Sequence, residues 1–215
     1  MATQTLKVPN KLSEITLGQY QQFSKISTDD AEEDFLQKKT IEIFCGVDLK
    51  DVNTFKYSSI IKVIQIINKM FNQKPSLTQR FKYKKYEFGF IPKLDDMSFG
   101  EYVDLDTLMS DWETMHEAMA VLFRKIENKT KNDYTIVDYN INETEDMKQM
   151  PLDVALGAIF FLDSLKTELY NHILNYLKTE SKKIKTEQKQ HLQKIMDGGF
   201  HFTPLVKETS QNLSK

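Results

Sequence analysis

The chain has 215 residues, a length that suits one domain or two small ones. Its 29 lysines and arginines are balanced by 31 aspartates and glutamates, which argues against a protein that coats nucleic acid through bulk positive charge. The hydrophobic content of 40% is enough for a core and argues against wholesale disorder.

The single cysteine, Cys45, excludes an internal disulfide framework and a thiolate zinc site. No apolar run reaches the ~18 residues of a membrane span, and the first residues lack the pattern of a signal peptide. We therefore expect a soluble protein made in the cytoplasm. Only two residues, Arg80 and Arg124, are arginines, so the chain has little of the guanidinium chemistry that usually recognises phosphate.

An internal repeat organises the chain. Residues 9–20 and residues 92–102 align when one residue is dropped, with proline, glycine and tyrosine recurring in the same order. Any two capped helix starts share some features, but this order favours a duplication. We predict the same strand–turn–helix unit over residues 5–26 and 86–108. The matched positions are Lys11 with Lys93, Leu12 with Leu94, Gly18 with Gly100, and Tyr20 with Tyr102.

Each copy contains a capping box, a helix start in which two side chains satisfy backbone amides reciprocally. The boxes are Thr16-x-x-Gln19 and Ser98-x-x-Glu101. An apolar residue before each cap and a tyrosine at the fourth helical position add a hydrophobic staple. The glycine at the second helical position costs helix stability, so its presence in both copies indicates a backbone packed closely against something.

Two further helices are expected in the first half. Thr28-Asp29-Asp30 is a plausible cap for a helix over residues 30–45 that ends at Gly46. Apolar residues fill Ser58 to Phe71 without alternation, which predicts a deeply buried helix with one wet stripe. The side chains expected to point inward from the first helix are Phe35, Ile41, Phe44 and Cys45.

A β-hairpin is expected around Lys84-Lys85, where aromatic residues alternate on both sides. The aromatics could stack bases, but we interpret them as the core face of a sheet. A helix over residues 111–126 and a short strand over residues 134–139 follow. The apolar stripe predicted for that helix is Trp112, Met115, Met119, Leu122 and Ile126.

Pro151 suits the first position of a long helix. Its core stripe is expected to persist to Leu177, and the helix to continue to Met196 as a solvated basic arm before Gly198-Gly199. The sequence thus predicts an α+β, predominantly helical fold, with a small sheet and a long C-terminal helix. We divide it into an N-terminal lobe (1–75), a hairpin and core part (76–177) and a basic arm with a tail (178–215).

No constellation of catalytic, cofactor-binding or metal-binding residues emerges. Cys45 has no histidine near it and reads as a small core residue. His116 lies near Glu113 and Glu117, a weak metal candidate that is more often a solvated helix edge. Asp104 and Asp106 follow a helix start, where acids are ordinary partners of the helix dipole. We expect no enzyme, no cofactor and no metal, although catalytic groups can converge from distant positions.

Charge is segregated along the chain. Residues 94–117 hold eight acids and no lysine or arginine, whereas residues 166–194 hold seven lysines and three glutamates. Two solvated faces would explain this pattern, but an acidic and a basic surface could also bind each other between copies, in a ring or an array. Apolar residues after Gly198-Gly199 are anchors expected to dock on another molecule. The interaction candidates are Asp95, Asp96, Asp104, Asp106, Asp111, Lys182, Lys183, Lys185, Lys189, Phe200, Phe202 and Leu205.

Residues 88–102 read Phe-Gly-Phe-Ile-Pro-Lys-Leu-Asp-Asp-Met-Ser-Phe-Gly-Glu-Tyr, and with residues 120–126 and 150–161 they resemble small morphogenesis proteins of tailed bacteriophages. The resemblance is strongest to phages of Bacteroidetes hosts, including the crAss-like group, and covers residues 5–177. The layout of the first half, with Ile-Glu-Ile-Phe-Cys-Gly at residues 41–46 between two helices, also resembles phage tail assembly chaperones.

These resemblances imply a protein that binds other virion proteins and copies of itself. We expect a non-enzymatic virion component near the portal, the head–tail connector or the tail, located in the virion and in the host cytoplasm during assembly. A tail assembly chaperone absent from the mature virion is the first alternative, and an unrecognised enzyme is the second. No membrane or small-molecule partner is expected, and nucleic acid is at most a secondary partner.

Overall fold

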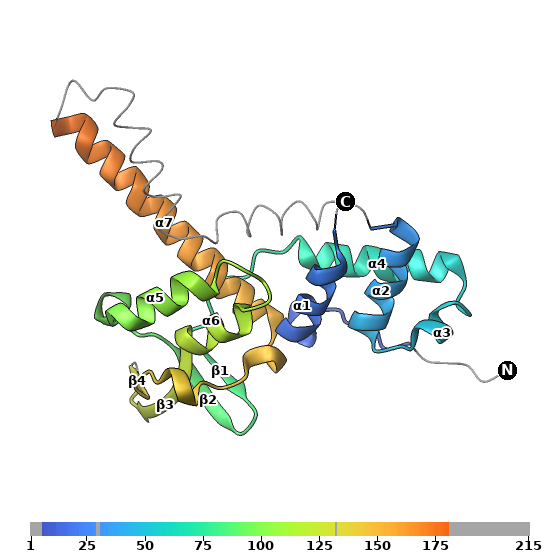
Figure 1. Cartoon of the computed structure of the whole chain (residues 1–215), viewed down its shortest axis with the longest axis horizontal. Helices are drawn as coiled ribbons and strands as arrows, with labels where there is room; N and C mark the ends of the chain where they lie inside the picture. The colour runs from blue at the N-terminus through green and yellow to red at the C-terminus, as the bar shows by residue number, and fades with distance from the viewer. Residues whose placement is uncertain (1–5, 29–30, 132, 181–215) are drawn as a thin grey trace.

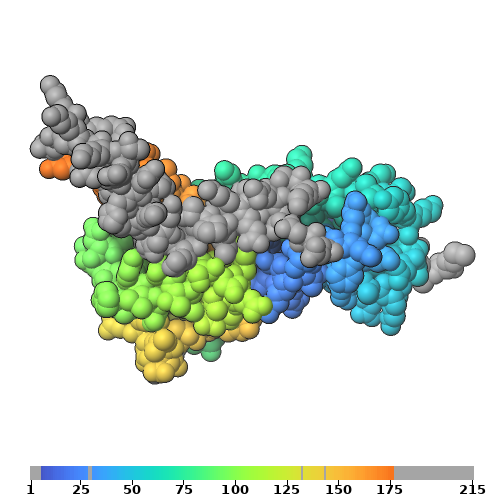
Figure 2. Space-filling view, turned by 45° about the horizontal axis from the view of Figure 1, so that its top comes forward, coloured from blue at the N-terminus to red at the C-terminus, as the bar shows by residue number. Residues whose placement is uncertain are grey.

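The computed structural model describes residues 6–28, 31–131 and 133–180. This part is α+β and mostly helical, as predicted, with a four-stranded antiparallel sheet and a long last helix. Helix α1 lies in the middle of the molecule, with α2 to α4 at one end and the sheet, α5 and α6 at the other (Figures 1 and 2). None of the helices in these ranges is long and apolar enough to cross a membrane. The helices are α1 (Leu17–Ile26), α2 (Glu33–Cys45), α3 (Leu49–Val52), α4 (Tyr57–Phe71), α5 (Phe99–Leu108), α6 (Met115–Leu122) and α7 (Leu152–Glu180).

Helices α2 and α4 form the N-terminal end together with the short α3, which the sequence analysis did not predict. Helix α2 ends at Gly46 in the left-handed conformation (φ 66°), as expected of a C-terminal glycine. Its N-terminal neighbour is Glu32, which makes no side-chain cap. Phe35 is 41% exposed, so the prediction that it points inward is wrong.

One face of α4 is buried, and the rest is not. The prediction of a deeply buried helix with a single wet stripe is therefore too broad, since Ile66 is 44% exposed. The reason is its position at the end of the molecule, where α4 packs on α2 and has no element on its other side in the described chain (Figure 1). Aromatic contacts join this face to α1 and α2, with ring centroids 5.6 Å apart for Tyr20–Phe71 and 5.3 Å apart for Phe44–Phe71.

The predicted hairpin is present. Strands β1 (Arg80–Tyr83) and β2 (Tyr86–Phe90) pair in antiparallel register around Lys84-Lys85, and Lys84 has a positive φ of 53°. Its aromatic rings pack on one another and on Phe123, which supports the core interpretation of these residues over base stacking. The sheet is completed by β3 (Phe123–Lys129) and β4 (Tyr134–Ile136), in the order β1-β2-β3-β4.

The helix predicted over residues 111–126 is only half correct. Helix α6 ends at Leu122, and from Phe123 the chain runs as strand β3, with Phe90 opposite Phe123. A third strand satisfies the open edge of the hairpin, and this tertiary pairing overrides the helical periodicity that Ile126 continued. The predicted stripe up to Leu122 is buried as expected.

Helix α7 leaves the body of the molecule partway along its length (Figure 1). Its apolar residues are buried or partly buried up to Leu162, but Leu165 is 41% exposed and Leu169 58%. The expectation that the core stripe persists to Leu177 is therefore wrong, and the exposed part of the helix begins about four turns earlier. Pro151 precedes the helix and pairs as an isolated bridge with Thr16, so it is not the first helical residue.

A single cluster of buried hydrophobic side chains includes residues of α1 to α7 and of the sheet, and it surrounds the first copy of the repeat. The division of the chain into residues 1–75, 76–177 and 178–215 stays a prediction.

Candidate interaction surface

Both copies of the repeat adopt the same local structure. Each consists of an extended residue, a three-residue 3₁₀ turn, a second extended residue, the cap and a ten-residue helix. The turns are η1 (Leu12–Glu14) and η2 (Leu94–Asp96). Both capping boxes form in full, with the amide of the third helical residue donating to the cap hydroxyl at 3.1 Å in the first copy and 3.2 Å in the second. The predicted turn and capped helix are thus present twice, but the predicted strand is not: residues 6–10 belong to no strand, whereas residues 86–90 form β2.

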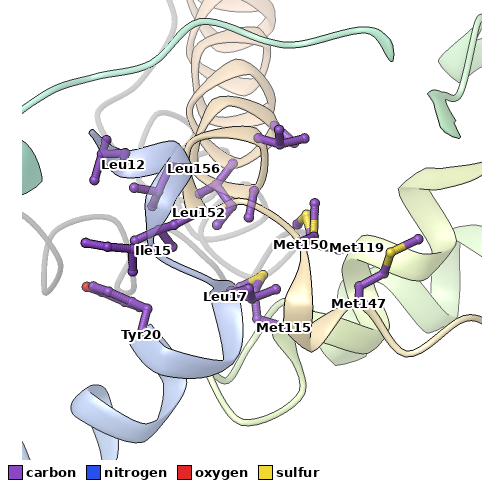
Figure 3. Close-up of a cluster of buried hydrophobic side chains, with 14 of the residues drawn as sticks. Leu12, Ile15, Leu17, Tyr20, Met115, Met119, Met147, Met150, Leu152 and Leu156 are labelled. Carbon is purple, nitrogen blue, oxygen red and sulfur yellow. The ribbon is translucent and has the colours of Figure 1, made fainter. Parts of the chain in front are cut away.

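The first copy is covered by the segment that leads into α7, residues 147–152. The amide of Leu17 donates to the carbonyl of Met150 at 3.0 Å, and the amide of Leu152 donates to the carbonyl of Ile15 at 2.9 Å. Side chains from both segments interlock with α6 in a buried cluster (Figure 3). Gly18 lies under the backbone of Lys148, where an added Cβ would be 3.0 Å from the carbonyl oxygen.

The second copy has no such cover from the described residues. Phe99, which corresponds to the fully buried Leu17, is 82% exposed. A Cβ added to Gly100 would meet no heavy atom closer than the Ser98 hydroxyl at 4.0 Å. The isolated bridge found in the described part of the chain belongs to the first copy, at Thr16–Pro151.

An apolar groove of about 190 Å³ separates the second copy from α7. On one side it is bounded by Leu94, Met97 and Tyr102, which correspond to Leu12, Ile15 and Tyr20 of the first copy. Leu165 and Leu169 of α7 form much of the other side. We call the groove together with the exposed Phe99 and Val103 the α5–α7 surface.

The acidic candidates do not form one plate. Asp95 and Asp96 are exposed on η2, and Asp111 is exposed in the loop before α6, where its Oδ1 accepts from the amide of Glu113 at 2.9 Å. Asp104 accepts from the Tyr139 hydroxyl at 2.8 Å, and Asp106 is half-buried with one carboxylate oxygen enclosed. The structure thus leaves Asp95, Asp96 and Asp111 facing solvent and turns Asp104 and Asp106 partly inward.

A buried ion pair lies behind this helix. Arg124 Nη2 lies 2.7 Å from Glu101 Oε1, and only 12% and 8% of the two side chains are exposed. Burial opposes ionisation of Glu101, but the Ser98 amide and hydroxyl and the Arg124 charge outweigh it, so the pKa of Glu101 is lowered. Burial and the bond to Asp104 raise the pKa of Tyr139, whose ring lies 6.0 Å from the guanidinium.

The two arginines have different surroundings. Arg124 is committed to Glu101, while the guanidinium of Arg80 lies 5.8 Å from the centre of the Tyr134 ring. A hollow of about 520 Å³ lies beside Glu101, Arg124 and Tyr139. In it the positive charge of Arg124 is already balanced by a carboxylate.

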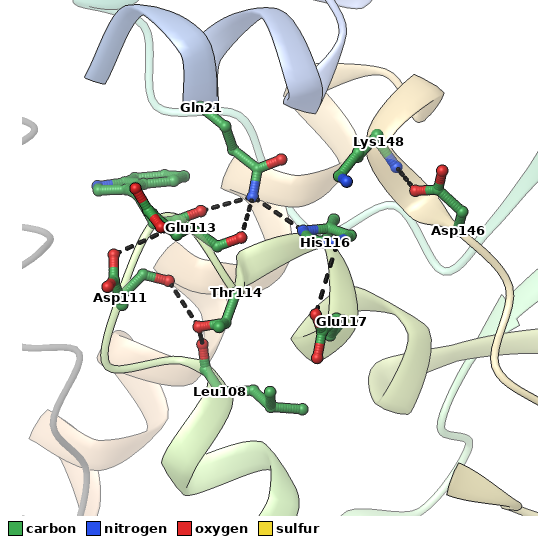
Figure 4. Close-up of polar contacts among 10 residues, drawn as sticks. Gln21, Leu108, Asp111, Glu113, Thr114, His116, Glu117, Asp146 and Lys148 are labelled. Carbon is green, nitrogen blue, oxygen red and sulfur yellow. Dashed lines mark hydrogen bonds and ion pairs between the residues drawn. The ribbon is translucent and has the colours of Figure 1, made fainter. Parts of the chain in front are cut away.

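His116 belongs to a polar network that ties α1 to α6 (Figure 4). Gln21 is buried and its amide nitrogen donates to the carbonyls of Trp112 and Glu113, at 2.5 Å and 3.1 Å, and lies 3.1 Å from His116 Nδ1. Burial, followed by the charge of Lys148, lowers the pKa of His116. Within the described ranges, no group of three histidine, cysteine or acidic residues could hold a metal.

Of the remaining residues considered, Cys45 and His172 lie in the described part of the chain, and those of the C-terminal part do not. Cys45 is half-buried, and burial raises the pKa of its thiol to about 11, which makes it a poor nucleophile at neutral pH. His172 is exposed on α7. The basic and apolar candidates of the C-terminal part lie outside the described residues: Lys182, Lys183, Lys185, Lys189, Phe200, Phe202 and Leu205.

Sequence reasoning missed the most prominent features of this surface. Leu165 and Leu169 continue the apolar period of α7 and so read as core. Phe99 reads as an ordinary first residue of a helix. Its exposure could not be predicted from the sequence, because Leu17 at the same place in the repeat is equally apolar and is buried.

Comparison of the chain with protein-family models, with curated proteins and with solved structures finds no match.

Proposed function

We propose that this protein is a non-enzymatic structural or assembly component of a tailed bacteriophage. It acts near the portal, the head–tail connector or the tail, by contacts with other virion proteins and with copies of itself. It resides in the virion, and in the host cytoplasm during assembly. The phage assignment rests on the sequence resemblance of residues 88–102, 120–126 and 150–161.

The observation that carries the protein–protein part of the proposal is the α5–α7 surface. It brings apolar side chains of two helices to the outside of a molecule that already has a full core, among them Phe99 at 82% and Leu169 at 58% exposure. Grouped exposed apolar side chains of this kind mark binding surfaces for other proteins. The high pKa of the Cys45 thiol and the pairing of Arg124 with Glu101 further favour a binding role over catalysis.

A tail assembly chaperone is the second candidate. The exposed Leu165 and Leu169 lie about one turn apart along a 29-residue helix, an apolar row against which an apolar helix of a client such as a tape-measure-like protein can pack. The two candidates differ in whether the protein stays in the finished particle.

Peptide mass spectrometry of purified particles and of the infected-cell lysate tests the proposal. A virion component is expected in the particles at a stoichiometry that survives further gradient purification. Abundance in the lysate with absence from the particles would refute the virion role and favour the chaperone.

The role of the surface is tested by Leu169→Glu, with Asn171→Glu as the matched control. Both side chains are exposed on α7, so neither change should unfold the protein. We expect L169E to reduce incorporation into particles, because it places a charge in the apolar surface, and N171E to leave it unchanged. Equal incorporation of the two variants contradicts the assignment of this surface.

A further inference from the structure

The two copies of the repeat differ in what covers them. In the first copy, residues 147–152 lie across the cap: Met150 and Leu152 bond to the backbone on either side of Thr16, and the Lys148 backbone closes over Gly18. In the second copy the corresponding cap is open in the described structure, although the backbone conformation of the unit is the same.

The glycine at the second helical position, Gly18 in one copy and Gly100 in the other, indicates what the uncovered second copy can bind. At Gly18 an added Cβ would crowd the Lys148 carbonyl oxygen, at 3.0 Å, so glycine suits this position. Gly100 keeps the same residue type at a helix position where it costs stability, yet no described backbone approaches it. This is the geometry expected of a second binding site for a segment like residues 147–152.

The β-bridge between Thr16 and Pro151 shows which residues a segment needs in order to dock in this way. Only the carbonyl of the residue before Pro151 and the amide of the residue after it bond to the first copy, so proline, which has no amide hydrogen, fits at the centre. An apolar residue must follow, because Leu152 is fully buried. Of the five prolines in the chain, only Pro151 and Pro204 are followed by leucine.

The chain contains a second segment that meets the condition. Phe200-His-Phe-Thr-Pro-Leu205 aligns with Met147-Lys-Gln-Met-Pro-Leu152, so Phe200 takes the place of the fully buried Met147 and Leu205 that of Leu152. Residues 200–205 lie outside the described residues, and the comparison is one of sequence.

We propose that residues 200–205 of one copy dock on the second repeat unit of a neighbouring copy, as residues 147–152 dock on the first unit within a chain. Thr203 and Leu205 would bond to the backbone at Phe99 and Met97, and the chain before them would cross Gly100. A contact of this kind is head to tail and generates a ring or an array. The inference rests on the proposed multi-copy role and identifies the contact through which copies join.

The size of the groove agrees with an anchor side chain. Its volume of about 190 Å³ is below the ~300 Å³ at which pockets for small molecules begin. Single large apolar side chains set into such hollows dominate many protein interfaces. Phe202 or Leu205 next to the bridge can supply this side chain.

The direction of α7 favours a neighbouring copy over the same chain. From Leu169 to Glu180, α7 advances ~16 Å past the groove, at ~1.5 Å per residue. The described chain therefore ends away from its own groove, on a helix that projects from the body of the molecule (Figure 1).

Disulfide trapping on the purified full-length protein tests the register. Phe99→Cys is placed on chains with one tag and Thr203→Cys on chains with another, and the two are mixed under mild oxidation. The corresponding pair in the first unit, Leu17 and Met150, is joined by a backbone bond of 3.0 Å, and paired strands bring Cα atoms within ~5.5 Å, a distance that a disulfide spans. Val103→Cys, exposed one turn further along α5, is the control for Phe99→Cys.

We expect the 99–203 pair to cross-link between chains at least tenfold faster than the 103–203 pair. A further sample uses one chain that carries both cysteines. Cross-linking only within that chain would show that the tail covers its own groove, and would overturn the proposal. Equal rates for the two pairs, or no cross-link, would overturn it as well. This measurement needs no phage particle. The docking can therefore be refuted even if the protein is found in virions, and it can be supported even if the protein is absent from them.

A second variant separates docking from folding. Gly100→Leu places a side chain where the described structure has open space, so the thermal midpoint should stay the same or rise. In sedimentation experiments it should weaken self-association at least tenfold, as Leu205→Asp should from the other side of the contact. Unchanged association in both variants would refute the docking.

Discussion

The two repeat glycines allow one substitution to be tested at equivalent places with opposite expected results. Glycine to alanine in a helix is worth roughly 0.5–1 kcal/mol of added stability when nothing else changes. At Gly100 the space for the methyl group is open, so we expect Gly100→Ala to stabilise the fold by about that amount.

At Gly18 the same methyl group meets the Lys148 carbonyl oxygen at 3.0 Å and the Lys148 Cβ at 3.2 Å. This carbonyl cannot move away easily, because Met147 and Met150 on either side of it are fully buried. Overpacking of a fixed site costs roughly 1–3 kcal/mol, which exceeds the helix gain. Gly18→Ala should therefore destabilise the protein by roughly 0.5–2 kcal/mol net.

The two variants should differ by roughly 1–3 kcal/mol, or ~2–12 °C in thermal midpoint for a chain of this size. Urea and thermal unfolding at low protein concentration, where association does not contribute, measure the difference. If the two substitutions shift stability in the same direction by the same amount, the close contact at Gly18 is not a feature of the folded protein.

Three other results are expected. Ser98→Ala should cost about 1 kcal/mol because the cap bond to the Glu101 amide is lost, and an unchanged unfolding curve would mean that the cap is not formed. Glu101 has a lowered pKa in the folded state, so the stability that it contributes is present above the pKa of the unfolded state, ~4.3, and is lost as the pH falls below that value. Urea unfolding between pH 3 and 7 should show this loss, and Glu101→Gln should remove this pH dependence. At pH 7 the same variant should destabilise the fold by about 3–5 kcal/mol, because Arg124 stays buried without its partner. Truncation after Leu177 should leave a folded protein that no longer associates, since the buried part of α7 ends at Leu162; a truncated chain that unfolds, or that still associates, would contradict this.

Local signals in the sequence were sufficient for the elements whose ends are fixed by local chemistry. Both capping boxes, the C-terminal Gly46 and the hairpin at Lys84-Lys85 depend on residues within a few positions of one another, and all four are present. The hydroxyl, the glycine and the alternating aromatics determine these structures without the rest of the fold.

Where the elements end and which side chains are exposed depend on tertiary contacts, which the apolar periodicity of the sequence does not show. Residues 123–126 continue a helical stripe, but the unpaired edge of β2 recruits them as β3. Ile66 and Leu165 fit the apolar period of their helices, yet each lies where no other described element covers it. A sequence shows which positions are apolar but not how far the neighbouring layer extends, so exposure on α4 and α7 could not be predicted.

The acidic candidates illustrate the same limit at the proposed surface. A run of acids without basic residues suggests one charged plate, but the period of a helix distributes them around α5. Glu101 and Asp104 turn toward Arg124 and Tyr139 on the sheet and its following loop, partners that are distant in sequence. Of these candidates, Asp95, Asp96 and Asp111 remain exposed, and the first two lie on the turn next to the apolar groove.

With this placement, we expect the charged residues and the apolar residues to affect different rates, of association and of dissociation between copies. Exposed charges at the edge of an interface mainly set the rate and orientation of association and are screened by salt, whereas buried apolar anchors set how long a contact lasts. Asp95 and Asp96 lie in the chain between Leu94 and Met97, which line the groove, and the lysines expected to approach them precede Phe200. Raising the salt concentration should therefore slow association of the wild-type protein with little effect on its dissociation rate, whereas Leu205→Asp should accelerate dissociation at every salt concentration. If salt changed the dissociation rate as strongly as the association rate, the contact would be held mainly by charge, and the groove would not be its anchor.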